Sequence, residues 1–313
     1  MAFTRTSIVR GPAIITYGSE SFFSNDDIRI SAGNEIFPIV NSAFGKVQER
    51  ISQRTFTVEF TPVGVPSSSF WNFGTMKAGD SFLGSSDVDL VVHSLAGVKV
   101  TCYNVALTRL PDLILSTVKT CCGPMQFTVL GKGRPTLVDQ DDPESYIKVE
   151  TGINPTISFD PDEIITERYF SAWGSKSAPW DDIRTSDGWQ VSIDLNLQPV
   201  VIDSHGLIDY TVGDVRATAR CIPIGITDIN LISQSGTPII PLHLQRGAPL
   251  ESDEDLGITG DSGTIIVQIK NAEVRVAPLQ YGLTTNRLGT VEWTGLRRVV
   301  SSAVGDVFSV TVS

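Results

Sequence analysis

The chain has 313 residues, of which 41% are hydrophobic and 19% charged, and its formal net charge at pH 7 is −11. This composition indicates a folded protein with enough length for two ordinary domains, and it excludes a disordered chain. The negative charge argues against specific binding of DNA or RNA, because nucleic-acid affinity comes mainly from Lys and Arg side chains that displace counterions from phosphates.

Strand-forming residues dominate the sequence. Val, Ile, Thr and Ser recur throughout, and 27 Gly and 17 Pro interrupt the apolar runs. The clearest strand covers 55–60, where Phe56, Val58 and Phe60 alternate with polar residues at the period of a half-buried strand. We therefore expect a mainly β fold.

The sequence contains an internal repeat. The segment 38–64 aligns with 199–225 without a gap. The matched residues include those that set backbone geometry, since Gly permits positive φ and Pro ends the hydrogen bonding of a strand. The matched pairs are Pro38 and Pro199, Gly45 and Gly206, Pro62 and Pro223, and Gly64 and Gly225.

Further blocks match in the same order along the chain. They are DDIR at 26–29 and 181–184, strand–turn–strand segments at 89–100 and 264–276, and the segments 127–134 and 291–298. Four blocks in one order predict a tandem duplication. The boundaries that we expect are a first domain at 1–140, a linker at 141–160 with a strand near 146–150, and a second domain at 161–313.

Each copy is expected to be a β-sandwich or small barrel with one short flanking α-helix. Capping residues followed by apolar residues at helical spacing predict these helices within 65–79 and 226–236. The strand at 216–221 turns the small residues Ala217, Ala219 and Cys221 inward. The second core must therefore be filled from other strands.

The search for catalytic or metal-binding motifs finds none that is convincing. The paired acids Asp26/Asp27 and Asp181/Asp182 occur in both copies, which favours a structural turn over an active site. The acidic segment 251–263 lacks the spacing of an EF-hand and is interpreted as a solvated loop. The four Cys residues lack the spacing of a zinc or redox site and indicate free thiols in a reducing compartment.

We expect no enzyme activity, no cofactor and no metal. We also expect no membrane span, because no apolar stretch is long enough.

Three stretches of the chain resemble the major tail tube proteins of long-tailed, siphovirus-like bacteriophages. They are 10–31 (RGPAIITYGSESFFSNDDIRIS), 44–64 (FGKVQERISQRTFTVEFTPVG) and 180–189 (WDDIRTSDGW). The resemblance implies tail-tube β-sandwich domains with a flanking helix, in stacked rings that line a channel for DNA. Members with two tandem domains per chain form trimeric, pseudo-sixfold rings, which fits the repeat.

The resemblance also implies partners and a location. The partners would be further copies of this chain, the tape measure protein and the tail-end proteins, and DNA would cross the lumen without specific binding. The location would be the tail of the virion, assembled in the host cytoplasm.

Two alternatives remain open. One is another tail component on the same fold, such as a distal ring, hub or terminator, or a decorating protein. The other is a carbohydrate-binding or carbohydrate-hydrolysing β-sandwich that uses the scattered Trp and Asp residues.

Residue roles follow from the match of the hairpins 41–53 and 202–214 to the long loop by which this family reaches the adjacent ring. An acidic wall would not retain DNA, because tight DNA binding needs cationic side chains. We expect contact with the next ring from Phe44, Val47, Ile51, Leu207, Ile208 and Tyr210. We expect a lumen or subunit-boundary position for Glu49, Glu59, Asp209 and Asp214.

Overall fold

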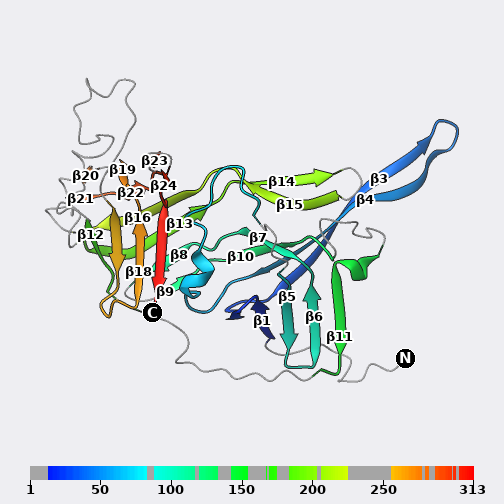
Figure 1. The fold of residues 1–313 in the computed structure, drawn as a ribbon, viewed down its shortest axis with the longest axis horizontal. Helices are drawn as coiled ribbons and strands as arrows, with labels where there is room; N and C mark the ends of the chain where they lie inside the picture. Colours follow the sequence, from blue (N-terminus) through cyan, green and yellow to red (C-terminus); the bar gives the residue numbers. More distant parts are fainter. Residues whose placement is uncertain are drawn as a thin grey trace.

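The computed structural model describes residues 13–82, 88–116, 120–132, 142–153, 167, 169–174, 183–202, 206–224, 255–276, 279–281, 286–297, 299–300 and 303–313. These residues form a mainly β fold of antiparallel sheets (Figure 1), as the composition predicts. Four larger sheets make the body of the molecule, and six further strands pair as three two-stranded hairpins.

The first half of the chain builds two of the larger sheets. Sheet 1 has, in order, β11 (Ile147–Thr151), β6 (Val98–Cys102), β5 (Leu90–Ser94), β1 (Ala13–Tyr17) and β2 (Glu20–Phe23). Sheet 2 has β3 (Arg29–Asn41), β4 (Gly45–Phe60), β10 (Met125–Val129) and β7 (Val105–Arg109). The two sheets pack through aromatic contacts, since the Tyr17 and Phe127 ring centroids lie 4.9 Å apart and those of Phe22 and Phe60 lie 5.7 Å apart.

The second half builds most of the other two larger sheets. Sheet 3 has β12 (Ser171–Gly174), β17 (Leu256–Thr259), β18 (Ile265–Ile269) and β25 (Phe308–Val312). Sheet 4 has β19 (Glu273–Val276), β22 (Val291–Thr294), β16 (Arg216–Pro223), β13 (Thr185–Asp194), β8 (Leu113–Leu115) and β9 (Thr120–Cys122). Because β8 and β9 belong to the first half in sequence, sheet 4 joins the two halves.

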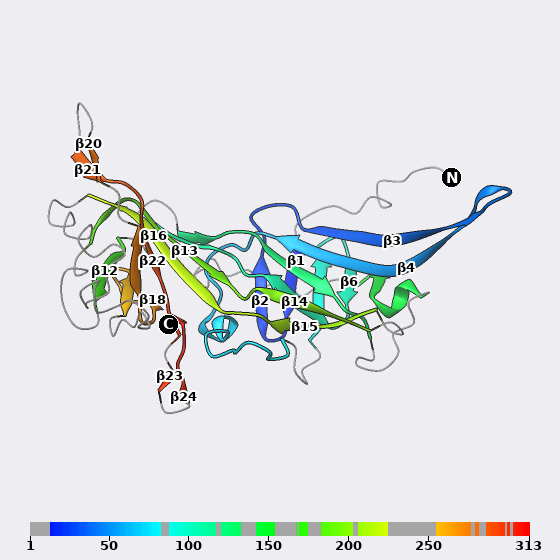
Figure 2. The same ribbon diagram turned by 90° about the horizontal axis from the view of Figure 1, so that it is seen from above.

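The three hairpins are β14 (Leu197–Ile202) with β15 (Gly206–Val212), β20 (Leu279–Tyr281) with β21 (Asn286–Leu288), and β23 (Val299–Val300) with β24 (Ala303–Val304). We call the distal part of β3–β4 the first arm and β14–β15 the second arm. The first arm extends beyond the body, whereas the second arm runs alongside the first half (Figures 1 and 2).

The alternation expected for the strand at 55–60 is present in β4. Val58 and Phe60 are buried, and Thr57 and Glu59 on the other face are half-buried. Phe56, also expected to point inward, is only half-buried at the edge of the core. In β16 the inward residues Ala217, Ala219 and Cys221 are also buried, as the period predicts. The space left by these small residues is filled by Trp189 and Trp293, whose ring centroids lie 5.3 Å apart.

The helix expected within 65–79 is a single 3-10 turn, η2 (Ser68–Trp71). Phe70 and Trp71 are buried, and the Trp71 indole donates to the carbonyl of Pro66. Ser68 ties this turn to the second half, because its Oγ accepts from the Val312 N–H at 2.7 Å. The helix expected within 226–236 lies outside the described residues.

The range 141–160, expected as a linker, contains ordered structure. It includes the 3-10 turn η3 (Pro143–Ser145) and the strand β11, which pairs with β6 from Ile147 opposite Cys102 to Thr151 opposite Val98. The strand expected near 146–150 is therefore present, and it is an edge strand of sheet 1.

Candidate assembly surface

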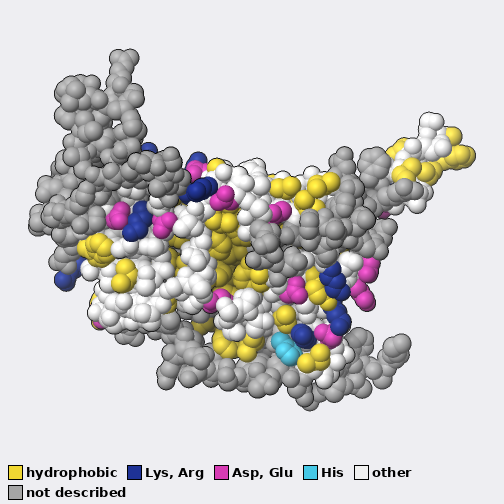
Figure 3. Space-filling view, in the orientation of Figure 1, with side chains coloured by type: hydrophobic (Ala, Val, Ile, Leu, Met, Phe, Trp, Pro, Cys, Tyr) yellow, Lys and Arg dark blue, Asp and Glu magenta, His cyan; other side chains and the backbone are white. Residues whose placement is uncertain are grey.

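The first arm presents apolar side chains to solvent. Its turn is formed by Asn41, whose side chain accepts from the Ala43 N–H at 2.7 Å, and by Gly45, which has φ 73°. Around this turn Phe44 is 81% exposed, Val40 66% and Val47 52%. Figure 3 shows these hydrophobic side chains at the end of the arm, away from the rest of the molecule. Isolated exposed Val or Phe residues are common, but three on one protruding tip indicate a contact surface.

The second arm is covered by the first half. The Phe82 N–H donates to the Tyr210 carbonyl at 2.8 Å, and the Val212 N–H donates to the Asp80 carbonyl at 2.9 Å. Burial raises the pKa of Tyr210, and the side chain also hydrogen-bonds with Thr128 of β10. Of the residues expected to contact another ring, Leu207 and Tyr210 thus pack on this chain's own core.

The other expected contact residues differ in exposure. Ile208 is half-buried in β15, and Ile51 lies in β4 opposite Ile36, with its side chain outside the described set. At the tip of the second arm, Val201 is 56% exposed and Ile202 43%. In the second arm, Val201 and Ile202 of β14 are therefore exposed, whereas Leu207 and Tyr210 of β15 pack on the core.

The four acids expected at a lumen or boundary have local partners or lie in an open hollow. Glu49 forms an ion pair with Lys46, and Asp214 forms one with Arg216 at 2.8 Å. Asp209 accepts from the Ser81 hydroxyl and from the Tyr210 N–H. Exposed ion pairs of this kind contribute little to stability. Glu59, the fourth acid, lines the open hollow at the start of β3.

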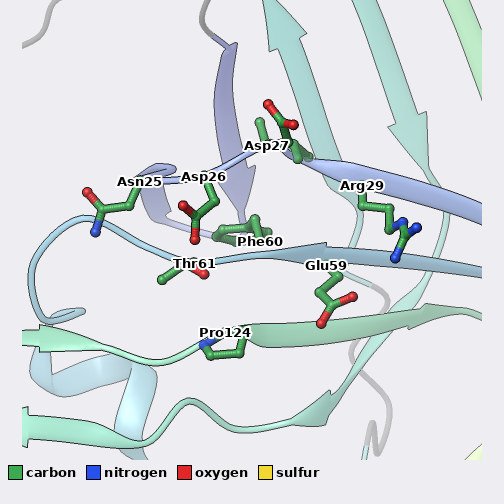
Figure 4. A pocket seen from close by; sticks show the side chains of 9 residues that line it. Asn25, Asp26, Asp27, Arg29, Glu59, Phe60, Thr61 and Pro124 are labelled. Carbon is green, nitrogen blue, oxygen red and sulfur yellow. The ribbon is translucent and has the colours of Figure 1, made fainter.

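This hollow also contains Asp26 and Asp27, from the repeated DDIR motif. The loop is held to the end of β4, since the Asn25 N–H donates to the Thr61 carbonyl at 2.8 Å. The Asp26 and Asp27 side chains point in different directions (Figure 4), so they do not form a pair of facing carboxylates. This arrangement agrees with a structural turn. Asp181 and Asp182 lie outside the described residues.

The described part of the chain contains no cluster of His, Cys, Asp or Glu that could hold a metal ion. In the segment 251–263, interpreted as a solvated acidic loop, the described residues are 255–263, and the interpretation is wrong for Leu256–Thr259, which form β17 with Leu256 and Ile258 fully buried. These apolar residues fill the core of sheet 3, and Asp255 before them accepts from the Asn271 N–H at 2.9 Å. Trp71, Trp189 and Trp293 are buried, so none of these rings is presented for stacking on a sugar. Within the same residues, no helix is long and apolar enough to cross a lipid bilayer.

One connection between the halves was not expected from the sequence. The strands β8 and β9 continue from β7 and return to β10, and β8 pairs with β13 of the second half. The hairpin thus leaves sheet 2 and joins sheet 4. The sequence does show that this hairpin belongs to the internal repeat. A gapless alignment of 113–130 with 279–296 matches Leu113, Gly123 and Leu130 to Leu279, Gly289 and Leu296. No protein-family model matches this chain, and no curated protein matches it.

Proposed function

We propose that this chain is a structural subunit whose halves are diverged copies of one β module, and that its copies assemble into stacked rings forming a phage-tail tube. The observation that carries the proposal is the order of strands in the sheets. Sheet 1 contains the order β11-β6-β5-β1, followed by β2, and sheet 3 has the order β25-β18-β17-β12, in which each strand has the same place in the chain order of its half. Sheet 2 runs β3-β4-β10-β7, and sheet 4 contains β13-β16-β22-β19.

A repeated polar corner supports the duplication. Asn104 follows β6 with φ 48°, and its N–H donates to Asp89 at 2.9 Å. Asn271 follows β18 with φ 46°, and its N–H donates to Asp255 at 2.9 Å. A non-glycine residue with positive φ is uncommon, so the same residue type held by the same contact at both places favours common ancestry.

The ladders support the same correspondence. Phe127 lies opposite Val58 in sheet 2, and Trp293 lies opposite Ala219 in sheet 4. Both β7 and β19 have a register shift beside this position. On this correspondence, Phe127 matches Trp293, so the sequence alignment of 127–134 with 291–298 is displaced by two residues. The alignment of 89–100 with 264–276 is displaced by a whole strand, because β5 and β6 are paired neighbours in sheet 1, whereas β18 and β19 lie in sheets 3 and 4.

Two similar modules in one chain favour a ring. A contact between the second module of one copy and the first module of the next is heterologous, and repetition of such a contact closes when its rotation permits. Exposed strand edges that would promote aggregation in a single chain become paired in the ring. The net charge of −11 suits a wall past which DNA moves without binding.

Stacking of rings is assigned to the two arm tips. Val40 and Val201 occupy corresponding positions and are 66% and 56% exposed. Together with Phe44 and Val47 they form apolar contacts suited to a further copy of the chain. The resemblance to tail tube proteins favours DNA passage over other uses of a tube.

Negative-stain electron microscopy of the concentrated purified protein tests this function. We expect long hollow rods with threefold or pseudo-sixfold end views. Single closed rings that do not stack would favour a distal-ring, hub or terminator component. Monomers that form no particles but bind a glycan array would favour the carbohydrate-binding alternative.

A further inference from the structure

The contact between the two halves of the chain uses a strand from one half to extend a sheet of the other. In sheet 4, β8 pairs with β13 through Leu113 opposite Val191, Ile114 opposite Gln190 and Leu115 opposite Trp189. Leu113, Leu115 and Val191 are fully buried at this junction. The edge of β13 is therefore closed within the chain.

The second half contains a counterpart of the β8–β9 hairpin. The alignment of 113–130 with 279–296 carries β8 onto β20 and β9 onto β21, and the internal pairing is the same. Leu113 lies opposite Cys122, and Leu279 lies opposite Leu288. In the described part of the chain, β20 and β21 pair only with each other. Figure 2 shows this hairpin projecting from the end of the molecule opposite the first arm.

The first half contains a counterpart of the closed edge. The ladder registers carry Arg29 of β3 onto Gln190 of β13, because Arg29 lies opposite Glu59 and Gln190 lies opposite the matched residue Arg220. In the same way Ile30 corresponds to Val191, since their partners Val58 and Ala219 are matched. The DDIR motifs at 26–29 and 181–184 are therefore six residues out of register with this correspondence. Among the described residues β3 pairs only with β4, so its other edge is open. Ile30 is 36% exposed, whereas Val191 is completely buried. An apolar residue is thus exposed at the place where its counterpart is covered by β8.

The arms show the same difference. All five residues from Gly45 to Glu49 are exposed on the first arm, whereas Gly206–Tyr210 on the second arm are half-buried against the first half. The end strands of sheets 1 and 3 differ in the same way. Val310 of β25 is 6% exposed, whereas Val149, at the corresponding position of β11, is 61% exposed. Three features of the first half therefore lack a cover that their counterparts have.

We propose that β20 of one copy adds to the open edge of β3 in the next copy, reproducing the β8–β13 junction. The register is Leu279 opposite Ile30, Gln280 opposite Arg29 and Tyr281 opposite the residue before β3, Ile28. Strand addition satisfies unpaired backbone groups, and the pockets for alternate side chains fix the register. The inference rests on the proposed assembly for closure of the ring, and the strand contact itself is tested separately.

Disulfide cross-linking between two variants tests the register. Chains carrying Arg29→Cys are mixed with chains carrying Gln280→Cys under assembly conditions, oxidised with diamide, and run on a gel without reductant. Arg29 is exposed, so its replacement leaves the fold intact. Directly paired strand positions suit a disulfide, and Cα atoms more than about 7 Å apart do not bridge.

Two controls match this experiment. The first replaces Arg287 in place of Gln280, since Arg287 lies opposite Gln280 on β21 and thus one strand further from β3. The second is a single chain with Ile114→Cys and Gln190→Cys, a pair that is directly opposed in the structure, and with Cys121→Ser, because Cys121 lies opposite Ile114 on β9 and would compete for the disulfide. This chain reports whether a disulfide forms at the same register when the strands are known to be paired.

We expect a covalent dimer from Arg29→Cys with Gln280→Cys, at a yield at least about ten-fold above that with Arg287→Cys. Tubes that form without this dimer, while the Ile114–Gln190 pair does oxidise, would overturn the strand addition and leave the tube function standing. The dimer in rings that never stack would support the strand addition and contradict the tube. Absence of both assembly and dimer would overturn both.

Discussion

Trp293 lies opposite Ala219 across the β16–β22 ladder, and both side chains are fully buried. At the corresponding place in sheet 2, Phe127 lies opposite Val58. Sheet 4 thus pairs a larger ring (Trp) with a smaller residue (Ala) than sheet 2, which pairs Phe with Val. The combined side-chain volume of the two pairs is therefore similar. We predict that Trp293→Ala lowers the free energy of unfolding by about 3–5 kcal/mol, because it leaves a cavity that the surrounding strands cannot fill. Urea unfolding followed by far-UV circular dichroism measures the change.

The same pair provides a matched compensation test. Ala219→Val alone adds volume beneath Trp293 and should cost about 1–3 kcal/mol by overpacking. Trp293→Phe with Ala219→Val recreates the pair of sheet 2, and we expect this double variant to be more stable than Ala219→Val alone. The indole N–H of Trp293 has no acceptor among the described residues, so its removal leaves no partner unpaired. A double variant less stable than Ala219→Val alone would contradict this account of the core.

The polar corner is predicted to stabilise both halves. Asn104 is 5% exposed, and its amide donates to the Gly131 carbonyl at 2.7 Å. We expect Asn104→Ala to lower the free energy of unfolding by about 2–4 kcal/mol, because it combines positive φ strain with a lost buried hydrogen bond. Asn104→Gly removes only the hydrogen bond and should cost less. Asn271→Ala and Asn271→Gly, compared by the same denaturation, should fall in the same order.

The junction between β8 and β13 depends on a glycine. Gly188 has φ 89° at the register shift of β13, and a Cβ there would meet the Leu115 carbonyl and Ser116. Gly152 has φ 78° with open space around it. We predict that Gly188→Ala lowers the melting temperature and the free energy of unfolding by clearly more than Gly152→Ala, for which about 1–2 kcal/mol of backbone strain is expected. Equal effects would mean that the close approach to β8 is unimportant.

The sequence predicts the β class and the strand at 55–60 because both depend on local composition and on alternation at one strand's own period. It also predicts the turns at Gly45 and Gly206, where both residues have positive φ. It does not predict that β8 joins sheet 4, because pairing between distant strands depends on which edge remains open after folding. The expected helix within 65–79 failed for a related reason: Phe70 and Trp71 are buried in a single turn that is tied to β25 by Ser68.

The candidate surface was predicted only in part. Phe44 and Val47 are exposed as a contact surface requires, and an isolated apolar tip can be recognised from a turn flanked by strands. Tyr210 has the same sequence signature in the second arm, yet it packs on Thr128 of the first half. The sequence gives the same expectation for both arms. The arms differ in burial because the second arm packs on the other half of its own chain, whereas the tip of the first arm is exposed.

Burial of Cys102 predicts a loss of stability in alkali. Burial raises the pKa of this thiol from 9.0 to about 12, and the negative charge of Asp89 adds to the effect. The unfolded thiol ionises first, so its contribution to folding is fully present below pH 9 and is lost as the pH rises toward 12. The slope is at most about 1.4 kcal/mol per pH unit. We expect Cys102→Val to have a shallower decline in unfolding free energy than the wild type between pH 9 and pH 11. Identical declines would show that the pKa of this thiol is the same in the folded and unfolded states.

The first arm tip gives the sharpest test of stacking. Phe44→Asp with Val47→Asp places two charges on side chains that are 81% and 52% exposed, so the folded chain should keep its unfolding transition within about 0.5 kcal/mol of the wild type. Burial of these charges between rings would be costly, and we expect the variant to give closed rings without tubes in negative-stain images. Phe44→Leu with Val47→Ile keeps an apolar tip and should still form tubes. Because strand addition at β3 lies at the other end of that strand, ring closure should survive in both variants. Tubes of normal length from the double aspartate variant would show that the tip does not join adjacent rings.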